Sequence, residues 1–359
     1  MAPYEVLDAL VLRPLGPAIG HRLALLGLQL RLPFGAEAVH DPFRWRGLEL
    51  QNRVGVAAGF DKNAVALAGI QATGAGFVEV GTILTRPWAG SPLRPRMVRL
   101  HAERGIWNRL GFPSDGLRVV AGRLARFRRN KLAVGCNIAP HPLTLRTTGE
   151  PGFAKRVCDE LDELVSALHP HAQFFVVNLS SPNTSGLRGV LHGDGFAQEI
   201  VAPTRARLHA LAREAGRSEA TPLLVKLPPE TPERAAWGAD SLRSLVEPLA
   251  HRDVCDGFVA VNTSIGLALA KSPHAQPGAP GGVSGAPLFQ HALGAMRALR
   301  ELARPEQLRI GVGGVLAGDD ARALVAAGAQ LVEVYSGMIY RGPGLIVECA
   351  RALAEPVPV

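Results

Sequence analysis

Short apolar runs alternate with helix-length segments along most of the chain, beginning at Val54. Each run is rich in bulky or β-branched residues and nearly free of charge, which is typical of strands buried on both faces of a parallel sheet. Eight such runs occur, at residues 54–58, 77–82, 132–138, 174–180, 222–227, 257–263, 308–314 and 331–337. Helical periodicity fills the intervals, for example at residues 319–329 after the seventh run.

Eight strands joined by helical crossovers predict an α/β fold of the (β/α)₈ TIM-barrel type, with an N-terminal helical extension. An open doubly wound sheet is the alternative. The chain shows no internal repeat and no low-complexity linker, so we expect a single barrel domain over residues 41–359. Two connections, residues 83–131 and 263–307, are longer than a minimal barrel requires, and we expect them to form loops over the catalytic mouth.

Residues 1–40 precede the barrel pattern and hold two short apolar segments, which Pro14 and Pro17 separate. The second segment has leucines at positions 23, 25, 26, 28 and 30, almost all round a helix and more than one core-facing stripe requires. Such a helix pair can pack on the main domain, or it can lie in the surface of a membrane. No apolar run reaches the roughly 20 residues that a membrane span needs. On the pattern alone both interpretations stay open.

The composition argues against several function classes but does not identify the function. The 359 residues are 47% hydrophobic and 19% charged, which allows a large core. The net charge of +8 would suit nucleic acid or an anionic membrane, but the basic residues are scattered, so no nucleic-acid partner is predicted. Four distant cysteines and 11 dispersed histidines argue against disulfides and against any metal site. The N-terminus lacks the basic region of a secretory signal, so we predict an intracellular protein.

Polar residues or glycines follow every predicted strand, at the barrel end where active sites form. They are Lys62, Thr82, Asn137, Asn178, Lys226, Asn262, Thr263, Gly313, Gly314, Tyr335 and Ser336. One asparagine at a strand end is usually a turn residue or a cap, but such residues at all eight ends predict a shared site. Amides and two lysines without metal ligands suit a flat, hydrogen-bonding heterocycle such as a flavin.

The last two strand ends, IGVGGVLAGDD and VYSGMIYRGPG, are rich in glycine. Glycine lets the backbone approach an anion closely, and barrels often bind phosphate between these two loops. Leu316 stands where a dinucleotide fingerprint requires its third glycine, so we expect a mononucleotide-type phosphate. The fourth strand ends in NLSSPNTSGLR, but without a G-x-S-x-G motif or an adjacent histidine a serine hydrolase is disfavoured.

Seven motifs, in the same order along nearly the whole chain, resemble the dihydroorotate dehydrogenase family: AAGFDKN, FVEVGT, NLSSPNTSGLR, VKLPPE, GGVSG, IGVGGV and VYSGMIYRGP. The family carries FMN in its barrel and oxidises dihydroorotate to orotate in pyrimidine biosynthesis. In its membrane-associated, quinone-dependent class, the serine directly before the proline of NLSSPNT is the catalytic base. The resemblance therefore implies that class for this chain, with Ser181 removing a proton from C5 while C6 gives up a hydride.

The resemblance also assigns ligands, residue by residue, to the matching motif positions. FMN would contact Ala58, Gly59, Phe60, Asp61, Lys62, Thr82, Asn137, Asn178, Lys226, Val261, Gly285, Gly314, Tyr335 and Ser336. The dihydroorotate substrate would contact Lys62, Asn108, Arg109, Leu110, Gly111, Phe112, Asn178, Asn183, Asn262 and Thr263. A membrane quinone would bind near His21, Arg99 and Tyr335.

For residues 1–40 the resemblance implies a helix pair that touches the membrane surface and forms an apolar tunnel for the quinone. It implies a peripheral membrane protein, on the cytoplasmic face of the inner membrane in a bacterium or at the mitochondrial inner membrane in a eukaryote. We expect the protein to be a monomer. These expectations favour the membrane interpretation of the leucine-rich segment.

Three positions depart from the family's pattern. Ile138-Ala139-Pro140 replaces a Gly-Lys pair after the asparagine, Pro113-Ser114 replaces an Asn-Asn pair, and Val261 replaces a threonine. The first two changes reshape loops at the mouth and remove polar groups. They leave open the alternative of a flavin barrel that oxidises another cyclic substrate. A second alternative, from a different function class, is a non-catalytic barrel that binds a phosphate or nucleotide.

Overall fold

The structure, a computed structural model, describes residues 3–30, 38–128, 130–178, 180, 195–229, 239–267, 274 and 281–355. Its centre is a closed barrel of eight strands in the order β10-β12-β13-β3-β4-β7-β8-β9, with every neighbouring pair parallel. The strands are β3 (Val54–Val56), β4 (Phe77–Ile83), β7 (Ala133–Ile138), β8 (Phe174–Val177), β9 (Leu223–Leu227), β10 (Gly257–Ala260), β12 (Leu308–Val312) and β13 (Leu331–Val334). The predicted TIM barrel is confirmed, and the open sheet is excluded.

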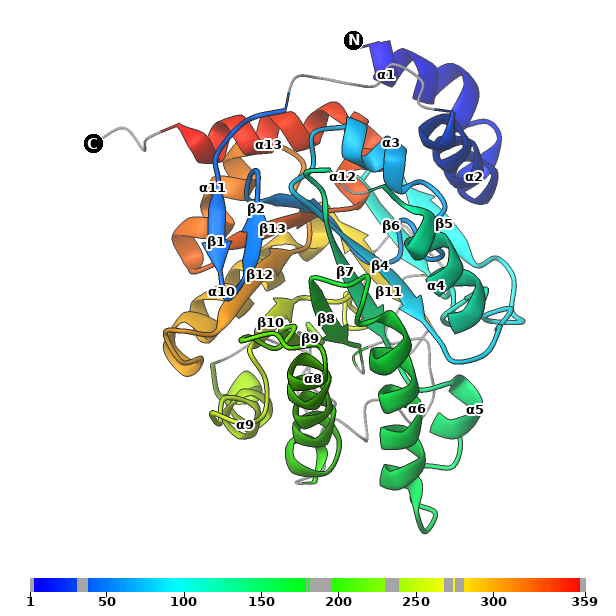
Figure 1. The fold of residues 1–359 in the computed structure, drawn as a ribbon. Helices are drawn as coiled ribbons and strands as arrows, with labels where there is room; N and C mark the ends of the chain where they lie inside the picture. Colours follow the sequence, from blue (N-terminus) through cyan, green and yellow to red (C-terminus); the bar gives the residue numbers. More distant parts are fainter. Residues whose placement is uncertain are drawn as a thin grey trace.

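Helices surround the barrel, as Figure 1 shows. The longer ones are α4 (Leu117–Arg126), α6 (Phe153–Leu168), α8 (Ala202–Glu214), α9 (Ala239–Leu249), α10 (Phe289–Leu302), α11 (Gly318–Ala327) and α13 (Gly344–Ala354). The shorter ones are α3 (Leu67–Ala72), α5 (Pro142–Leu145), η2 (Phe196–Val201), η3 (Ala286–Leu288) and α12 (Ser336–Arg341). Their apolar faces pack on the outward side chains of the strands in one continuous core, which explains why the strands are apolar on both faces.

The amino-terminal half of the barrel interior is filled by apolar side chains. Phe77 and Phe174 meet edge to face with ring centroids 6.0 Å apart, and a Cβ at Gly55 or Gly135 would overlap one of these rings. A hairpin of β1 (Phe43–Trp45) and β2 (Leu48–Leu50) adds its leucines to the same cluster. This end is a packed core, so the site must lie at the other end.

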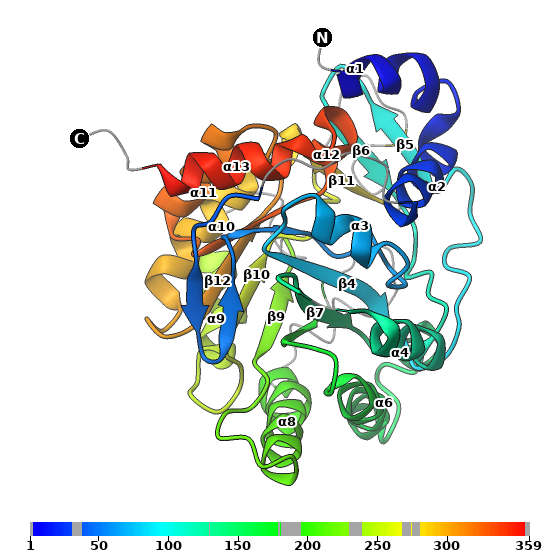
Figure 2. The ribbon, with the colours of Figure 1, turned by 45° about the horizontal axis from the view of Figure 1, so that its top comes forward.

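The two long connections contain a second sheet that the sequence pattern did not predict. It is antiparallel and consists of β5 (Met97–Leu100), β6 (Gly105–Asn108) and β11 (Gly282–Gly285), with β6 in the centre. β6 follows the second barrel strand and β11 follows the sixth, so the sheet joins distant parts of the chain. It lies between the barrel and the N-terminal helices (Figure 2).

The N-terminal segment forms α1 (Pro3–Leu7), a short π-helical turn η1 (Asp8–Leu12) and α2 (Gly16–Gln29). α2 packs on α3 and β5. The carboxylate Oδ1 of Asp8 on η1 lies 2.6 Å from Nη1 of Arg99 on β5, and both side chains are buried. This ion pair ties the helices to the second sheet. The domain boundary at residue 40 stays a prediction.

The N-terminal helices expose many apolar side chains. Of the eleven exposed large aliphatic residues in the described ranges, nine lie between Val6 and Leu30, with Leu10 at 73% and Leu30 at 65%. Such a concentration on one layer is unusual for a surface that meets only water. None of the helices described is long and apolar enough to cross a membrane.

Candidate active site

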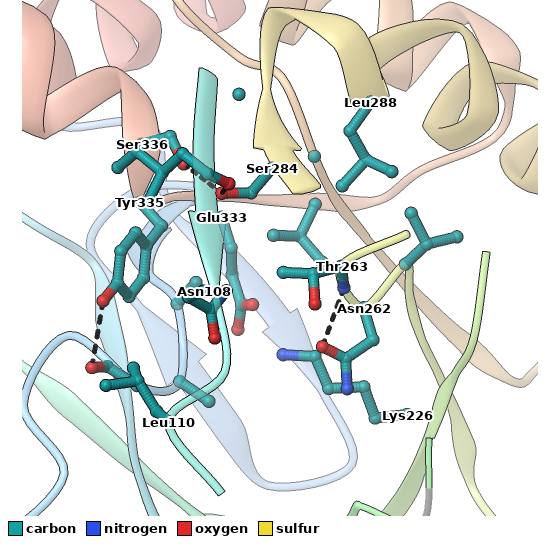
Figure 3. Close-up of a pocket in the computed structure, with 18 of the residues that line it drawn as sticks. Asn108, Leu110, Lys226, Asn262, Thr263, Ser284, Leu288, Glu333, Tyr335 and Ser336 are labelled. Atoms are coloured by element: carbon teal, nitrogen blue, oxygen red, sulfur yellow. Dashed lines mark hydrogen bonds between the residues drawn. The ribbon is translucent and has the colours of Figure 1, made fainter. Parts of the chain in front are cut away.

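A cavity opens at the carboxyl ends of the barrel strands, where sequence analysis placed the site (Figure 3). Eleven of the residues predicted for FMN line it: Ala58, Gly59, Lys62, Thr82, Asn178, Lys226, Val261, Gly285, Gly314, Tyr335 and Ser336. Six more that were predicted for the substrate also line it: Asn108, Leu110, Gly111, Phe112, Asn262 and Thr263. Residues at seven of the eight barrel strands, all except β7, and residues of the second sheet therefore converge on one space.

Four predicted residues lie beside the cavity rather than on its wall. Phe60 faces a second cavity, Asp61 and Asn137 are fully buried behind the wall, and Arg109 is turned outward, with its guanidinium donating to the carbonyls of Arg94 and Pro95. Ser181 and Asn183 lie outside the described residues.

An amide network fixes the polar side of the cavity. Thr82 Oγ1 donates to Asn137 Oδ1 over 2.6 Å, and Asn178 Nδ2 donates to the same oxygen over 3.1 Å. Ser180 Oγ donates to Asn178 Oδ1, and Asn262 Nδ2 donates to Ser180 Oγ over 2.9 Å. Because each amide is held by its neighbour, the groups that remain free for a ligand are fixed in direction.

Asp61 shapes the loop that carries Lys62. Its carboxylate accepts hydrogen bonds from the backbone N–H groups of Val65 (2.9 Å) and Ala66 (2.7 Å), which holds the loop after β3 in a tight turn. Lys62 donates to the carbonyl of Gly59 and lines the cavity. Burial lowers the pKa of Lys62 to about 8, against the opposing charge of Asp61. This lysine therefore titrates close to physiological pH.

Glycines form the opposite side of the cavity, after β12 and β13. Gly313 and Gly314 have φ of +132° and +77°, and a Cβ at Gly314 would lie 2.6 Å from the Cβ of Phe289. Asp320 accepts bonds from the N–H groups of Leu316 and Ala317, which fixes the loop. Bare backbone at one end and lysine and amide groups at the other fit a ligand with a phosphate and a polar ring, so the residues present fit FMN.

Ten further residues line the cavity that the site prediction did not include: Ala57, Met97, Ile106, Ser284, Leu288, Val312, Gly313, Val315, Glu333 and Gly337. Gly313 is the one among them that the sequence analysis named as a strand-end residue. Ser284 Oγ lies 2.9 Å from Ser336 Oγ, which links the second sheet to α12. Most of the others are apolar side chains that line the cavity.

A second cavity lies between the N-terminal helices and the second sheet, and its wall is almost wholly apolar. Phe60, Met97 and Ile106 line it together with residues of α1, η1 and α2. The predicted quinone residues His21 and Arg99 also line it, whereas Tyr335 lines the first cavity. Met97 and Ile106 border both spaces, so a single layer of side chains separates the two.

Aromatic rings connect the two cavities. The ring of His21 meets Phe60 edge to face at 5.4 Å between centroids, and Phe60 meets Tyr335 at 5.9 Å. Burial, with a smaller contribution from Lys62, lowers the pKa of His21 to about 3, so the imidazole is neutral. The charge of Arg99 is balanced by Asp8. The second cavity thus holds no unbalanced charge from these residues and suits an apolar ring compound.

The family model for dihydroorotate dehydrogenase matches residues 43–357. The chain belongs to the dihydroorotate dehydrogenase family. This confirms the family expected from the seven motifs, since the matched residues include the whole barrel from β3 to β13.

Relatives in this family match over nearly their whole length. A protein of Leptothrix cholodnii named dihydroorotate dehydrogenase (quinone) is 38% identical, with 94% of each chain covered. One of Thiobacillus denitrificans with the same name is 37% identical, over 97% of this chain and 95% of its own. A crystal structure of DHODH from Eimeria tenella in complex with ferulenol superposes with a TM-score of 0.79 at 30% identity, over 94% of this chain and 90% of that one.

The three departures from the dihydroorotate dehydrogenase pattern occupy different places. Val261 lines the first cavity. Ser114 forms two backbone hydrogen bonds with Trp88, each 2.9 Å long, and this pairing holds Pro113 and Ser114 in the loop beside the cavity wall. Ala139 and Pro140 are buried behind the wall. Of the three changes, Val261 therefore is the one that lines the described cavity.

Proposed function

We propose that this chain binds FMN, oxidises dihydroorotate to orotate in pyrimidine biosynthesis, and passes the electrons to a membrane quinone. The observation that supports this best is the pair of adjacent cavities in a member of the dihydroorotate dehydrogenase family. One has lysines, amides and bare glycine backbone, and the other is apolar. Met97 and Ile106 line both, and Phe60 of the second cavity contacts Tyr335 of the first. FMN held in the first cavity would supply a hydride acceptor for the substrate and an electron donor for the quinone.

In this proposal the wall residues hold the cofactor. The loops with Gly313, Gly314 and Ser336 would bind the phosphate through backbone N–H groups, and Lys226 would hold the polar edge of the ring. Asn137 would act indirectly, because it fixes Thr82 and Asn178 by hydrogen bonds. Asp61 would likewise act by placing Lys62.

The substrate would lie on the mouth side of the same cavity, against Asn108, Asn178, Asn183, Asn262 and Thr263, with Lys62 in reach of its anionic group. Ser181 would remove the C5 proton. Serine is a weak base at neutral pH, so its own proton must pass to water or a neighbouring group as it accepts one. Hydrogen bonds from the fixed amides to the ring carbonyl would make that C–H bond more acidic.

The N-terminal helices would bring the apolar cavity to the membrane. The exposed leucines between residues 6 and 30 would dip into the lipid surface, and a quinone would enter between α1 and α2. We propose peripheral attachment on the cytoplasmic side in a bacterium, with the protein as a monomer.

A steady-state assay tests the proposed function. The purified protein should be yellow, and it should reduce a short-chain quinone only when dihydroorotate is present. A yellow protein that reduces quinone with another cyclic substrate but not with dihydroorotate would favour the alternative flavin barrel. A colourless protein that binds inorganic phosphate or nucleotides would favour the non-catalytic barrel.

A further inference from the structure

Two buried glutamates and one lysine meet beneath the first cavity. Glu79 on β4 and Glu333 on β13 are completely buried, and Lys226 on β9 is nearly so. Lys226 Nζ lies 3.8 Å from Glu79 Oε2, and Asn137 donates to Glu79 Oε1. Figure 3 shows the ends of Lys226 and Glu333 pointing into the same part of the cavity, whose wall both residues line.

The charges of this cluster do not balance if all three groups are ionised. Two carboxylates and one ammonium leave one net negative charge in the barrel interior, where an uncompensated charge is costly. The strands β3, β8 and β10 contribute no ionisable residue. Arg309 on β12 donates to the carbonyl of Gly328 instead, and burial raises the pKa of Cys136 on β7 to about 12, so that thiol is neutral. Lys62, the other lysine that lines the cavity, follows β3 and donates to the carbonyl of Gly59. Among the described residues we therefore find no second cation paired with the two glutamates.

Hydrogen bonding leads to the same conclusion. Glu79 Oε2 and both oxygens of Glu333 are buried and accept no hydrogen bond from a donor group among the described residues. Glu79 is the neighbour that acts most strongly on Glu333, through its charge and as a side-chain hydrogen-bond partner. Two carboxylates have only acceptors, so this contact becomes a bond only when one of them holds a proton. Burial, and then the charge of Glu79, raise the pKa of Glu333 well above its ordinary value, although Lys226 opposes this.

We propose that Glu333 is a neutral carboxylic acid that donates a hydrogen bond to Glu79, so that Glu79 and Lys226 form a balanced ion pair beneath the cavity. Glu333 is then a positioning residue, since it acts on Lys226 through Glu79. The redox consequence rests on the proposed FMN: an ionised Glu333 would place negative charge beside the group that receives electrons and would disfavour its reduction. The protonation of Glu333 itself does not depend on that assignment.

Infrared spectroscopy of the purified holoenzyme tests the proton directly, because a protonated carboxyl group has a carbonyl band separate from that of carboxylates. At pH 8 the wild type should show this band. Glu333→Gln should lose it, although the glutamine side chain has the same shape as the neutral acid. Glu79→Gln should lose it as well, because Lys226 would then need the charge of Glu333. The exposed control Glu49→Gln should keep it. A wild-type spectrum without the band, or an unchanged band in Glu333→Gln, overturns the proposal, and a band retained in Glu79→Gln overturns the charge balance.

The pH dependence of the flavin reduction potential tests the positioning role. At neutral pH the wild type and Glu333→Gln should have the same potential. At the alkaline pH where the infrared band disappears, the wild-type potential should fall below that of the variant. Parallel curves across that pH range would overturn the role of Glu333 in tuning the cofactor. A protein that lacks activity on dihydroorotate leaves the infrared test intact, so failure of the proposed function is distinguished from failure of this inference.

Discussion

The two cavities of this protein differ in the charged groups that line them. In the barrel cavity, Lys62 and Lys226 face inward among fixed amides. In the helix-covered cavity, Arg99 is paired with Asp8 and His21 is neutral, and the rest of the wall is apolar. Burial alone therefore does not decide what a cavity binds. The residues that line a cavity determine what it binds. Here a single layer of side chains separates a site suited to a polar anion from one suited to an apolar ring.

Removing residues 1–34 should have the largest effect, because it affects one cavity and not the other. The apolar cavity loses one whole wall, while the barrel cavity keeps all its described lining residues. We expect quinone reduction and vesicle binding to disappear and the reduction of bound flavin by dihydroorotate to remain. Rapid-mixing measurements of the two half-reactions, with the full chain as control, check this. Equal loss of both half-reactions would contradict the division between the cavities.

Ser181→Ala should have the opposite effect. With the base removed, flavin reduction by dihydroorotate should slow by about 100- to 10,000-fold. FMN content and reoxidation of the reduced flavin by quinone should stay the same. The buried neighbour Ser180, which donates to Asn178, gives a matched variant: Ser180→Ala should weaken the amide network but leave a functioning base. If Ser181→Ala reduces its flavin at the wild-type rate, another group is the base.

Asp8→Asn should weaken the packing of the N-terminal helices over the apolar cavity without abolishing quinone binding. Leaving the buried Arg99 without its partner is expected to cost about 3–5 kcal/mol. The N-terminal helices should then be cut faster by protease, and the apparent affinity for quinone should fall. Asp159→Asn removes an exposed i,i+4 pair with Lys155, expected to contribute about 0.5 kcal/mol, and should behave like the wild type. Protease resistance that is the same in both variants would show that the buried pair does not hold the helices.

The smallest expected effect is on the pH dependence of orotate binding in the barrel cavity. Because the pKa of Lys62 is lowered to about 8, the free enzyme carries the ammonium below that pH and loses it above. Binding of the orotate anion should be constant up to about pH 8 and then weaken by about tenfold per pH unit, as a proton must be taken up with the ligand. Titration of the flavin absorbance with orotate between pH 7 and 9 measures this. In Lys62→Arg the weakening should be absent, and a parallel decline in both proteins would assign it to another group.

The sequence predicted the barrel well because its strands are local patterns. All eight apolar runs became barrel strands, and the run at 77–82 differs by one residue from β4 (Phe77–Ile83). The second sheet escaped prediction for a physical reason. Its strands are only four residues long, and β6 pairs with β11 far along the chain, so no local window contains both partners.

The polar residues of the site were predicted from the sequence, whereas its buried glutamates and apolar wall residues were not. Polar residues at strand ends were informative because barrel geometry brings those ends together. Glu79 and Glu333 were missed, since a single acid in an apolar strand has the same pattern whether it faces water or the barrel interior. Only the closed barrel shows that both face inward toward Lys226. Apolar wall residues such as Met97 and Ile106 have no chemical pattern that a sequence could reveal.

Anaerobic addition of dihydroorotate to the purified yellow protein tests the central claim most directly. The flavin absorbance should bleach within one turnover, and a short-chain quinone added afterwards should restore it. A flavin that dithionite bleaches but dihydroorotate does not would contradict the assignment of substrate to the polar cavity.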